Sequence, residues 1–305
     1  MPDRKPPRGR RAAGRRPTGA APPPRARAAI AKRTRAAAKQ TRAAASRARA
    51  AARTLIAVDV GNSEVVVGWF KGTTLDRFWR LTSSRQTADE ITLALAALLR
   101  DRLAASPRPG AVLCSVVPAL TLPWSEALAQ VSGRAPVEVG PTTAKALPIR
   151  YHDKSAVGAD RIANAIAARG LYGTPAIVVD LGTATTFDCV SKSGAYLGGV
   201  IAPGVGTSAE ELFRRAARVP RVELRKPERA LGRTTEESLR AGVLWGAAGQ
   251  VDALVRRIAL EMHGTPHVIA TGGWAKTIAP ECETVNVVDE GLTLKGLRLI
   301  WEANR

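Results

Sequence analysis

The stretch Ile177–Val190 reads IVVDLGTATTFDCV, and an earlier stretch, Ile56–Val67, reads IAVDVGNSEVVV. Each begins with a short apolar run typical of a buried strand, continues through Asp, Gly and small polar residues, and ends in a second apolar run. The pattern predicts a strand, a tight turn and a returning strand at both places. Because the same unit occurs twice, we expect two similar α/β halves that face one another across a cleft.

The two turns carry residue types suited to phosphate binding. Gly61 and Gly182 have no Cβ, so backbone N–H groups beside them can approach an anion closely, and the neighbouring hydroxyl and amide side chains add donors. Asp59 and Asp180 repel a bare phosphate but can hold Mg²⁺, directly or through water. Either turn taken alone is more often an ordinary hairpin turn. The repetition is what favours a pair of phosphate-binding turns.

The sequence Gly158-Ala159-Asp160-Arg161 stands where a helix over Gly158–Arg169 is expected to begin. One interpretation makes Asp160 a helix N-terminal cap. The other makes Asp160 the acceptor of a substrate hydroxyl proton and Arg161 the partner of a substrate carboxylate, which a guanidinium group can bind with two hydrogen bonds. Spacing alone favours the cap.

Other segments extend the α/β pattern. Apolar spacing predicts helices over Ala88–Arg100 and Leu239–Ile258 and strands over Ala111–Val117 and His267–Ala270. The glycine-rich segment Gly198–Gly204 predicts a turn that can admit a ligand, although two closely packed strands also require glycine. The segment Thr271-Gly272-Gly273 predicts backbone that lies flat against a base or a phosphate. Together these glycine turns favour a nucleotide cleft.

The charge of the chain is concentrated at its N-terminus. The 305 residues carry a formal net charge of +20. Residues 1–53 contribute +16 of this and are built mainly from Arg, Ala and Pro, so we predict a disordered basic tail. The remaining 252 residues carry only +4. The tail is interpreted as a solubilising extension, as a nonspecific contact to polyanions that neutralises phosphates, or as a targeting segment.

Several classes of protein are disfavoured. Three scattered cysteines, Cys114, Cys189 and Cys282, without a C-x-x-C pair, argue against a disulfide framework and a zinc ribbon. No apolar run reaches the roughly 18 residues that a membrane-spanning helix needs. We therefore expect a cytoplasmic location and no membrane partner.

A series of motifs, in a fixed order, resembles the type III pantothenate kinases, which belong to the actin, Hsp70 and sugar-kinase fold group. The resemblance covers about residues 54–300 and leaves the tail uncovered. It implies two duplicated actin-like (ribonuclease H-like) halves, residues 54–170 and 171–305, with a cleft between them. The motifs are Asp59–Ser63, Ser115–Pro118, Gly158–Ala165, Asp180–Asp188, Gly198–Gly204, Thr271–Gly273 and Leu292–Leu297.

The resemblance implies ATP-dependent phosphorylation of pantothenate to 4′-phosphopantothenate, with Asp160 as the catalytic base. It also implies a homodimer, Mg²⁺, which we expect at Asp180, and a monovalent cation (K⁺ or ammonium), which we expect at Asp188. The residues matched to pantothenate binding are Tyr151, Gly158, Ala159 and Arg161. Those matched to ATP and its phosphates are Asp59, Gly61, Asn62, Ser63, Gly182, Thr183, Ala184, Thr185, Gly272 and Gly273.

The chain departs from the family pattern in places. Ala216 stands where many members have Thr, and Lys154 follows Asp153 where the family often has Asn-Pro. Because of these departures, the sequence supports the identity of the substrate less strongly than it supports phosphoryl transfer. The alternative hypothesis is a noncatalytic, kinase-like transcriptional regulator of the Bordetella accessory-factor type that uses the basic tail on DNA. The presence of all the acidic motif residues favours the kinase, since a buried, unpaired carboxylate is costly without a function.

Overall fold

The computed structural model describes residues 54–105, 108–145 and 147–305. The predictions made for residues 1–53 lie outside the described residues. All described residues belong to one compact unit, and the division into halves at residues 170 and 171 stays a prediction. Among the residues that the structure describes, no helix is long and apolar enough to cross a bilayer.

Two five-stranded sheets repeat one strand order. The first sheet has the order β3-β2-β1-β4-β5, and the second, read from its opposite edge, has the matching order β8-β7-β6-β9-β10. In each sheet the first three strands pair antiparallel and the last three pair parallel. The strands are β1 (Thr54–Val60), β2 (Glu64–Lys71), β3 (Thr74–Thr82), β4 (Gly110–Ser115), β5 (Val137–Glu138), β6 (Ala176–Leu181), β7 (Ala184–Val190), β8 (Tyr196–Pro203), β9 (His267–Thr271) and β10 (Val287–Val288). The predicted duplicated α/β fold is confirmed.

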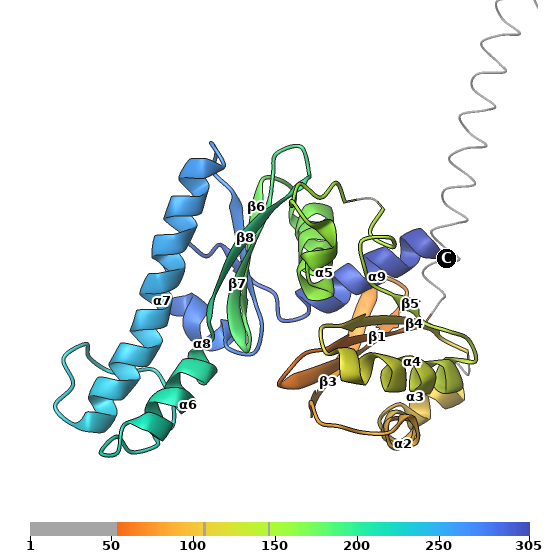
Figure 1. Cartoon of the computed structure of the whole chain (residues 1–305), viewed down its shortest axis with the longest axis horizontal. Helices are drawn as coiled ribbons and strands as arrows, with labels where there is room; N and C mark the ends of the chain where they lie inside the picture. The colour runs from red at the N-terminus through yellow and green to blue at the C-terminus, as the bar shows by residue number, and fades with distance from the viewer. Residues whose placement is uncertain (1–53, 106–107, 146) are drawn as a thin grey trace, which may run out of the picture. The chain divides into compact units, whose positions relative to one another are not determined.

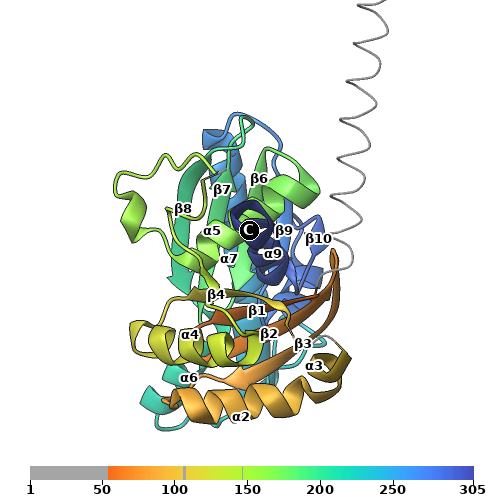
Figure 2. The ribbon, with the colours of Figure 1, turned by 90° about the vertical axis from the view of Figure 1, so that its right-hand side faces the viewer.

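Helices cover the sheets and fill the space between them (Figure 1). They are α2 (Ala88–Leu98), α3 (Arg100–Ala105), α4 (Pro118–Ser132), α5 (Ala159–Ala167), α6 (Val205–Arg215), α7 (Thr235–Glu261), α8 (Ala275–Ile278) and α9 (Leu292–Asn304). Figure 2 shows α2 and α4 on the outer face of the first sheet, where Leu95 and Trp124 pack against Trp69. Helix α7 covers the outer face of the second sheet, through residues such as Leu244 and Val251.

The central core lies between the two sheets. Ile162 of α5 and Leu297 of α9 belong to one buried cluster with Leu55 of the first sheet and Val178 of the second. The two helices cross at Gly296, where an added Cβ would lie 2.0 Å from the carbonyl oxygen of Ala163. This close crossing places the N-terminus of α5 between the two sheets.

One sequence-based expectation for the second sheet is wrong. The segment Gly198–Gly204, predicted as a ligand-admitting turn, is almost entirely strand β8. A Cβ on Gly199 would lie 1.6 Å from the carbonyl oxygen of Phe187 on β7. The glycine is required because the two strands pack closely, which is the alternative that the sequence left open.

Candidate active site

A cavity of about 1190 Å³ opens where the repeated turns meet. This volume is large enough for a nucleotide together with a small substrate. Its wall contains the turns after β1, β6 and β9 and the start of α5. The predicted site residues in the wall are Asp59, Gly61, Asn62, Ser63, Asp160, Asp180, Gly182, Thr183, Ala184, Gly272 and Gly273. The structure thus brings together residues that lie far apart in the sequence.

The two predicted phosphate turns touch each other. The hydroxyl groups of Ser63 and Thr183 are hydrogen-bonded at 2.8 Å. In each turn the glycine N–H closes the loop, from Gly61 to the carbonyl oxygen of Glu64 and from Gly182 to that of Ala184, both at 3.0 Å. The repeated units therefore form two closed turns of different length, the first with its bond three residues on and the second with its bond two residues on, and their hydroxyl groups meet at one point.

The turn after β9 requires its first glycine. Gly272 has a φ of +93°, a left-handed conformation that favours glycine. A Cβ at this position would lie 2.5 Å from Oδ1 of Asp180. The glycine lets the β9 turn approach the second phosphate turn closely, which keeps the backbone of both turns on the cavity wall.

Three carboxyl groups share this cavity. Burial raises the pKa of Asp59 to about 7, and the nearby charges of Asp160 and Asp180 add to the rise. Burial likewise raises the pKa of Asp180 to about 6 and that of Asp160 above its ordinary range. Oδ1 of Asp59 is buried and has no hydrogen-bond partner within the described part of the chain. A cation between these groups would favour their charged forms.

The carboxylates fit Mg²⁺ as part of a larger ligand set. Among the described residues, no three His, Cys, Asp or Glu side chains come together closely enough to hold a metal ion. Mg²⁺ usually keeps several waters and binds one or two carboxylates together with substrate phosphates. The unpartnered Oδ1 of Asp59 and the crowding of Asp59 and Asp180 match that pattern.

Asp160 lies at the start of α5, whose N-cap residue is Gly158. Its Oδ1 accepts a hydrogen bond of 2.7 Å from the backbone N–H of Arg161. Because Gly158 is the N-cap and no side chain caps the helix, the interpretation of Asp160 as the cap residue is wrong, although its carboxylate still accepts a bond from an N–H of the first turn. Asp160 lines the cavity, as its second interpretation requires.

Asp180 belongs to a chain of hydrogen bonds that sequence reasoning missed. Nδ2 of Asn164 donates to Oδ2 of Asp180 at 3.0 Å, and the hydroxyl group of Thr293 donates to Oδ1 of Asn164 at 2.8 Å. Asn164 is buried on α5, and Thr293 lies in the first turn of α9. Both stand inside motifs quoted above, which was the available signal. The two central helices therefore orient Asp180.

Arg161 and Asp188 form a buried ion pair outside the cavity wall. Nε of Arg161 lies 2.7 Å from Oδ1 of Asp188, which also accepts a 3.0 Å hydrogen bond from the hydroxyl of Tyr196. Burial raises the pKa of Asp188 to about 7, while the ion pair acts in the opposite direction. Tyr151 lies beside this group, with its ring 6.4 Å from that of Tyr196. The predicted residues that do not line the cavity are Tyr151, Gly158, Ala159, Arg161, Thr185 and Asp188.

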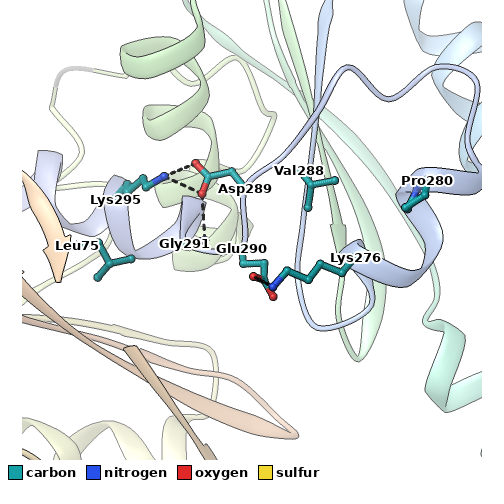
Figure 3. Close-up of a pocket in the computed structure, with 8 residues that line it drawn as sticks. All are labelled: Leu75, Lys276, Pro280, Val288, Asp289, Glu290, Gly291 and Lys295. Atoms are coloured by element: carbon teal, nitrogen blue, oxygen red, sulfur yellow. Dashed lines mark hydrogen bonds and ion pairs between the residues drawn. The ribbon is translucent and has the colours of Figure 1, made fainter. Parts of the chain in front are cut away.

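Figure 3 shows the residues that line a second cavity, of about 450 Å³. Glu290 lines both cavities. Lys276 pairs with Glu290 at 2.6 Å, and Lys295 binds both carboxylate oxygens of Asp289. Asp289 also accepts hydrogen bonds from the hydroxyl of Tyr172 and the N–H of Gly291. These bonds fix the start of α9, so we assign this cavity a structural role.

The comparisons of sequence agree on one family. A sequence model of a protein family described as type III pantothenate kinase matches residues 55–257. The type III pantothenate kinase of Moorella thermoacetica is 47% identical over 252 residues, which is 82% of this chain and 99% of that protein. The type III pantothenate kinase of Halalkalibacterium halodurans is 42% identical over 252 residues, with the same coverage. The crystal structure of the ethanolamine utilization protein EutJ from Carboxydothermus hydrogenoformans is similar in fold, with a TM-score of 0.51 at 15% identity over 80% of this chain and 89% of that chain.

Proposed function

Since this chain belongs to the type III pantothenate kinase family, we propose that it transfers the terminal phosphoryl group of ATP to the hydroxyl group of pantothenate. The chain is a kinase, and its product is 4′-phosphopantothenate, with which coenzyme A biosynthesis begins. The observation that carries the proposal is the single cavity in which both phosphate turns and Asp160 meet. The family match is to kinases, and it gives no support to the regulator hypothesis.

Asp160 is the proposed base. The pantothenate hydroxyl oxygen forms a bond to the terminal phosphorus of ATP, the bond from that phosphorus to the bridging oxygen breaks, and ADP leaves. The hydroxyl proton passes to the Asp160 carboxylate. Burial raises the pKa of Asp160, which increases its affinity for this proton. The helix N-terminus beside Asp160 favours the charged form that must exist before the transfer.

The proposed pantothenate residues are Tyr151, Gly158, Ala159 and Arg161, beside the start of α5. Asp188 and the carbonyl oxygen of Phe187 hold the guanidinium of Arg161 from one side, at 2.7 and 3.2 Å. A guanidinium oriented in this way loses little further freedom when it binds a substrate carboxylate. The ion pair with Asp188 therefore orients Arg161, and the assignment of Arg161 to the carboxylate of pantothenate rests on the family motif.

Mg²⁺ at Asp180 and a monovalent cation at Asp188 are the proposed ions. Mg²⁺, when bound, neutralises phosphate charge. Oδ2 of Asp188 is buried without a hydrogen-bond partner among the described residues, which supports a cation there. A requirement for ATP favours a cytoplasmic location.

The function is tested by coupling ADP release to a reporter, with the purified full chain, ATP, Mg²⁺ and pantothenate. We expect ADP release that depends on pantothenate and that increases when K⁺ or ammonium is added. Omitting pantothenate is the control for simple ATP hydrolysis. A folded protein that releases no ADP with either cation would contradict the proposed function.

A homodimer is also proposed, with the exposed face of α7 as its interface. Gly242, Gly246 and Gly249 lie on this face at helical spacing, and a Cβ on any of them would meet no described atom within 4 Å beyond the adjacent residues and the backbone of the helix itself. Each glycine costs a helix about 1 kcal/mol relative to alanine, so three on one face favour a close contact with another helix. Light scattering should give about twice the chain mass of 32.2 kDa. A mass equal to one chain would contradict the dimer.

Residues 1–53 are proposed to bind polyanions without a role in catalysis. The similarity to the M. thermoacetica enzyme covers 99% of that protein but 82% of this chain. We expect a chain without residues 1–53 to keep the kcat and both KM values of the full chain, because the kinase residues named above all lie after residue 53. Only the full chain should bind DNA, with an affinity that falls steeply with salt. Loss of turnover on truncation would contradict this prediction.

A further inference from the structure

Arg80 on β3 lies in line with Asp59 across the first sheet. Asp59 on β1 pairs with Val66 on β2, and Val66 pairs with Arg80. Directly opposite residues on neighbouring strands place their side chains on the same face of a sheet. All three residues line the large cavity. Neighbouring strands are about 4.8 Å apart, so a ligand held at Asp59 lies within reach of an arginine two strands away.

The guanidinium of Arg80 extends to the other sheet. Its Nη1 is 2.7 Å from Oε2 of Glu64, the residue that follows Ser63 of the first phosphate turn. A Cβ built on Gly273, in the turn after β9, would lie 4.0 Å from the same Nη1. The positive charge acts to lower the pKa of both Asp59 and Asp180. Arg80 therefore lies beside the first phosphate turn and near the β9 turn, and its charge acts on the aspartate of each phosphate turn.

Arg80 is the least exposed of the arginines that line the cavity among the described residues. The lining contains three arginines among the residues that the structure describes: Arg80, Arg214 and Arg221. Arg214 pairs with Glu211, and Arg221 pairs with Glu210, both on α6. Their side chains are 67% and 75% exposed, against 30% for Arg80. A less exposed cation interacts more strongly with a bound anion, because water screens the attraction less.

We propose that Arg80 binds the terminal phosphate groups of ATP and stabilises the negative charge that develops on them during transfer. This inference rests on the proposed kinase function. Before ATP binds, Glu64 holds the guanidinium in place. The planar fork of arginine matches two phosphate oxygens at once. In other phosphoryl-transfer enzymes an arginine in this role contributes about 10³–10⁵-fold to kcat.

The test compares three variants of the full chain. Arg80→Gln removes the positive charge. Arg80→Lys keeps the charge but loses the planar guanidinium that can bind two phosphate oxygens. Arg77→Gln is the matched control. Arg77 lies on the same strand, outside the cavity lining, over the ring of Trp79. The readouts are kcat, the KM values for ATP and pantothenate, and calorimetric affinity for a nonhydrolysable ATP analogue.

We expect Arg80→Gln to lower kcat/KM for ATP by about 10²-fold or more, with weaker binding of the analogue and an unchanged KM for pantothenate. Arg80→Lys should fall between Arg80→Gln and the unchanged chain, and Arg77→Gln should behave as the unchanged chain. Unaltered kinetics and analogue binding in Arg80→Gln would overturn the proposal. Equal losses in Arg80→Gln and Arg77→Gln, with equal losses of thermal stability, would also overturn it.

Analogue binding separates this proposal from the function itself. If the unchanged chain shows no pantothenate-dependent turnover, the proposed function fails. A weaker affinity for the analogue in Arg80→Gln, but not in Arg77→Gln, would still support a contact between Arg80 and the phosphates. An equal affinity in all chains would overturn that contact whatever the acceptor of the phosphoryl group is.

Discussion

Asp160→Asn is expected to lower kcat by about 10²–10⁴-fold, because an amide cannot accept the hydroxyl proton at the cavity wall. The substitution keeps the size of the side chain, and its oxygen can still accept the bond from the N–H of Arg161. Affinity for ADP should therefore stay the same, measured by calorimetry beside the ADP-release assay. Asp153→Asn is the matched control, since Asp153 lies in an exposed turn outside the cavity lining, where its side chain accepts hydrogen bonds from Ser155.

The pH profile gives a second readout of Asp160. The base must lose its own proton before it can act, so kcat/KM falls as the pH drops through the pKa of Asp160. Burial raises that pKa above the ordinary value of 3.8, which moves the acidic limb of the profile to higher pH. In Asp160→Asn the residual kcat/KM should no longer fall with pH on account of this residue, because asparagine does not titrate. Full activity in the variant would exclude Asp160 as the base.

The strand-turn-strand units could be predicted because their signals are local. Ile56–Val67 falls within β1 and β2, and Ile177–Val190 within β6 and β7. An apolar run followed by glycine and small polar residues depends on neighbours in the sequence alone. The glycines of Gly198–Gly204 are ambiguous for the same reason. Glycine suits both a turn and a tight strand contact, and the contact with Phe187 becomes visible only after the sheet is built.

In the candidate site, too, the sequence predicted local features but not the contacts between distant elements. The repeat predicted that the two phosphate turns face each other, and the Ser63–Thr183 hydrogen bond joins residues 120 positions apart. The sequence motifs contain the hydrogen-bond partners of Asp180 and Arg161 but do not pair them, because the bonds form only where α5 packs against strands β6 and β7. Arg80 stands outside the quoted motifs, and only the strand register places it in the cavity.

Asp59→Asn is expected to lower turnover strongly and yet to stabilise the folded protein at neutral pH. Burial, with added repulsion from Asp160 and Asp180, raises the pKa of Asp59 from 3.8 to about 7. The folded state therefore holds a proton that the unfolded state releases, and this group makes stability fall as the pH rises from about 4 to about 7. Asparagine does not titrate and so avoids this loss of stability. The free energy of unfolding should therefore rise by an amount on the order of 1–4 kcal/mol at pH 8.

The matched control, Asp252→Asn, is expected to change stability in the opposite direction from Asp59→Asn. Burial acts to raise the pKa of Asp252. Hydrogen bonds from the backbone N–H groups of Glu283 and Thr284, each 2.9 Å long, and from the Thr284 hydroxyl, together with the charge of Arg256, outweigh burial and hold the pKa below its usual value. Asp252→Asn should therefore lower the Tm at pH 8, while Asp59→Asn raises it by several degrees. Scanning calorimetry of the full chains without Mg²⁺ or nucleotide measures both. Turnover in Asp59→Asn should fall by about 10²–10³-fold, since the variant has lost a carboxylate that would help to hold Mg²⁺ beside the phosphates. A lower Tm for Asp59→Asn at pH 8 would mean that the carboxylate supports the fold, whereas a higher Tm with lost turnover would mean that the charge is kept for catalysis at the expense of stability.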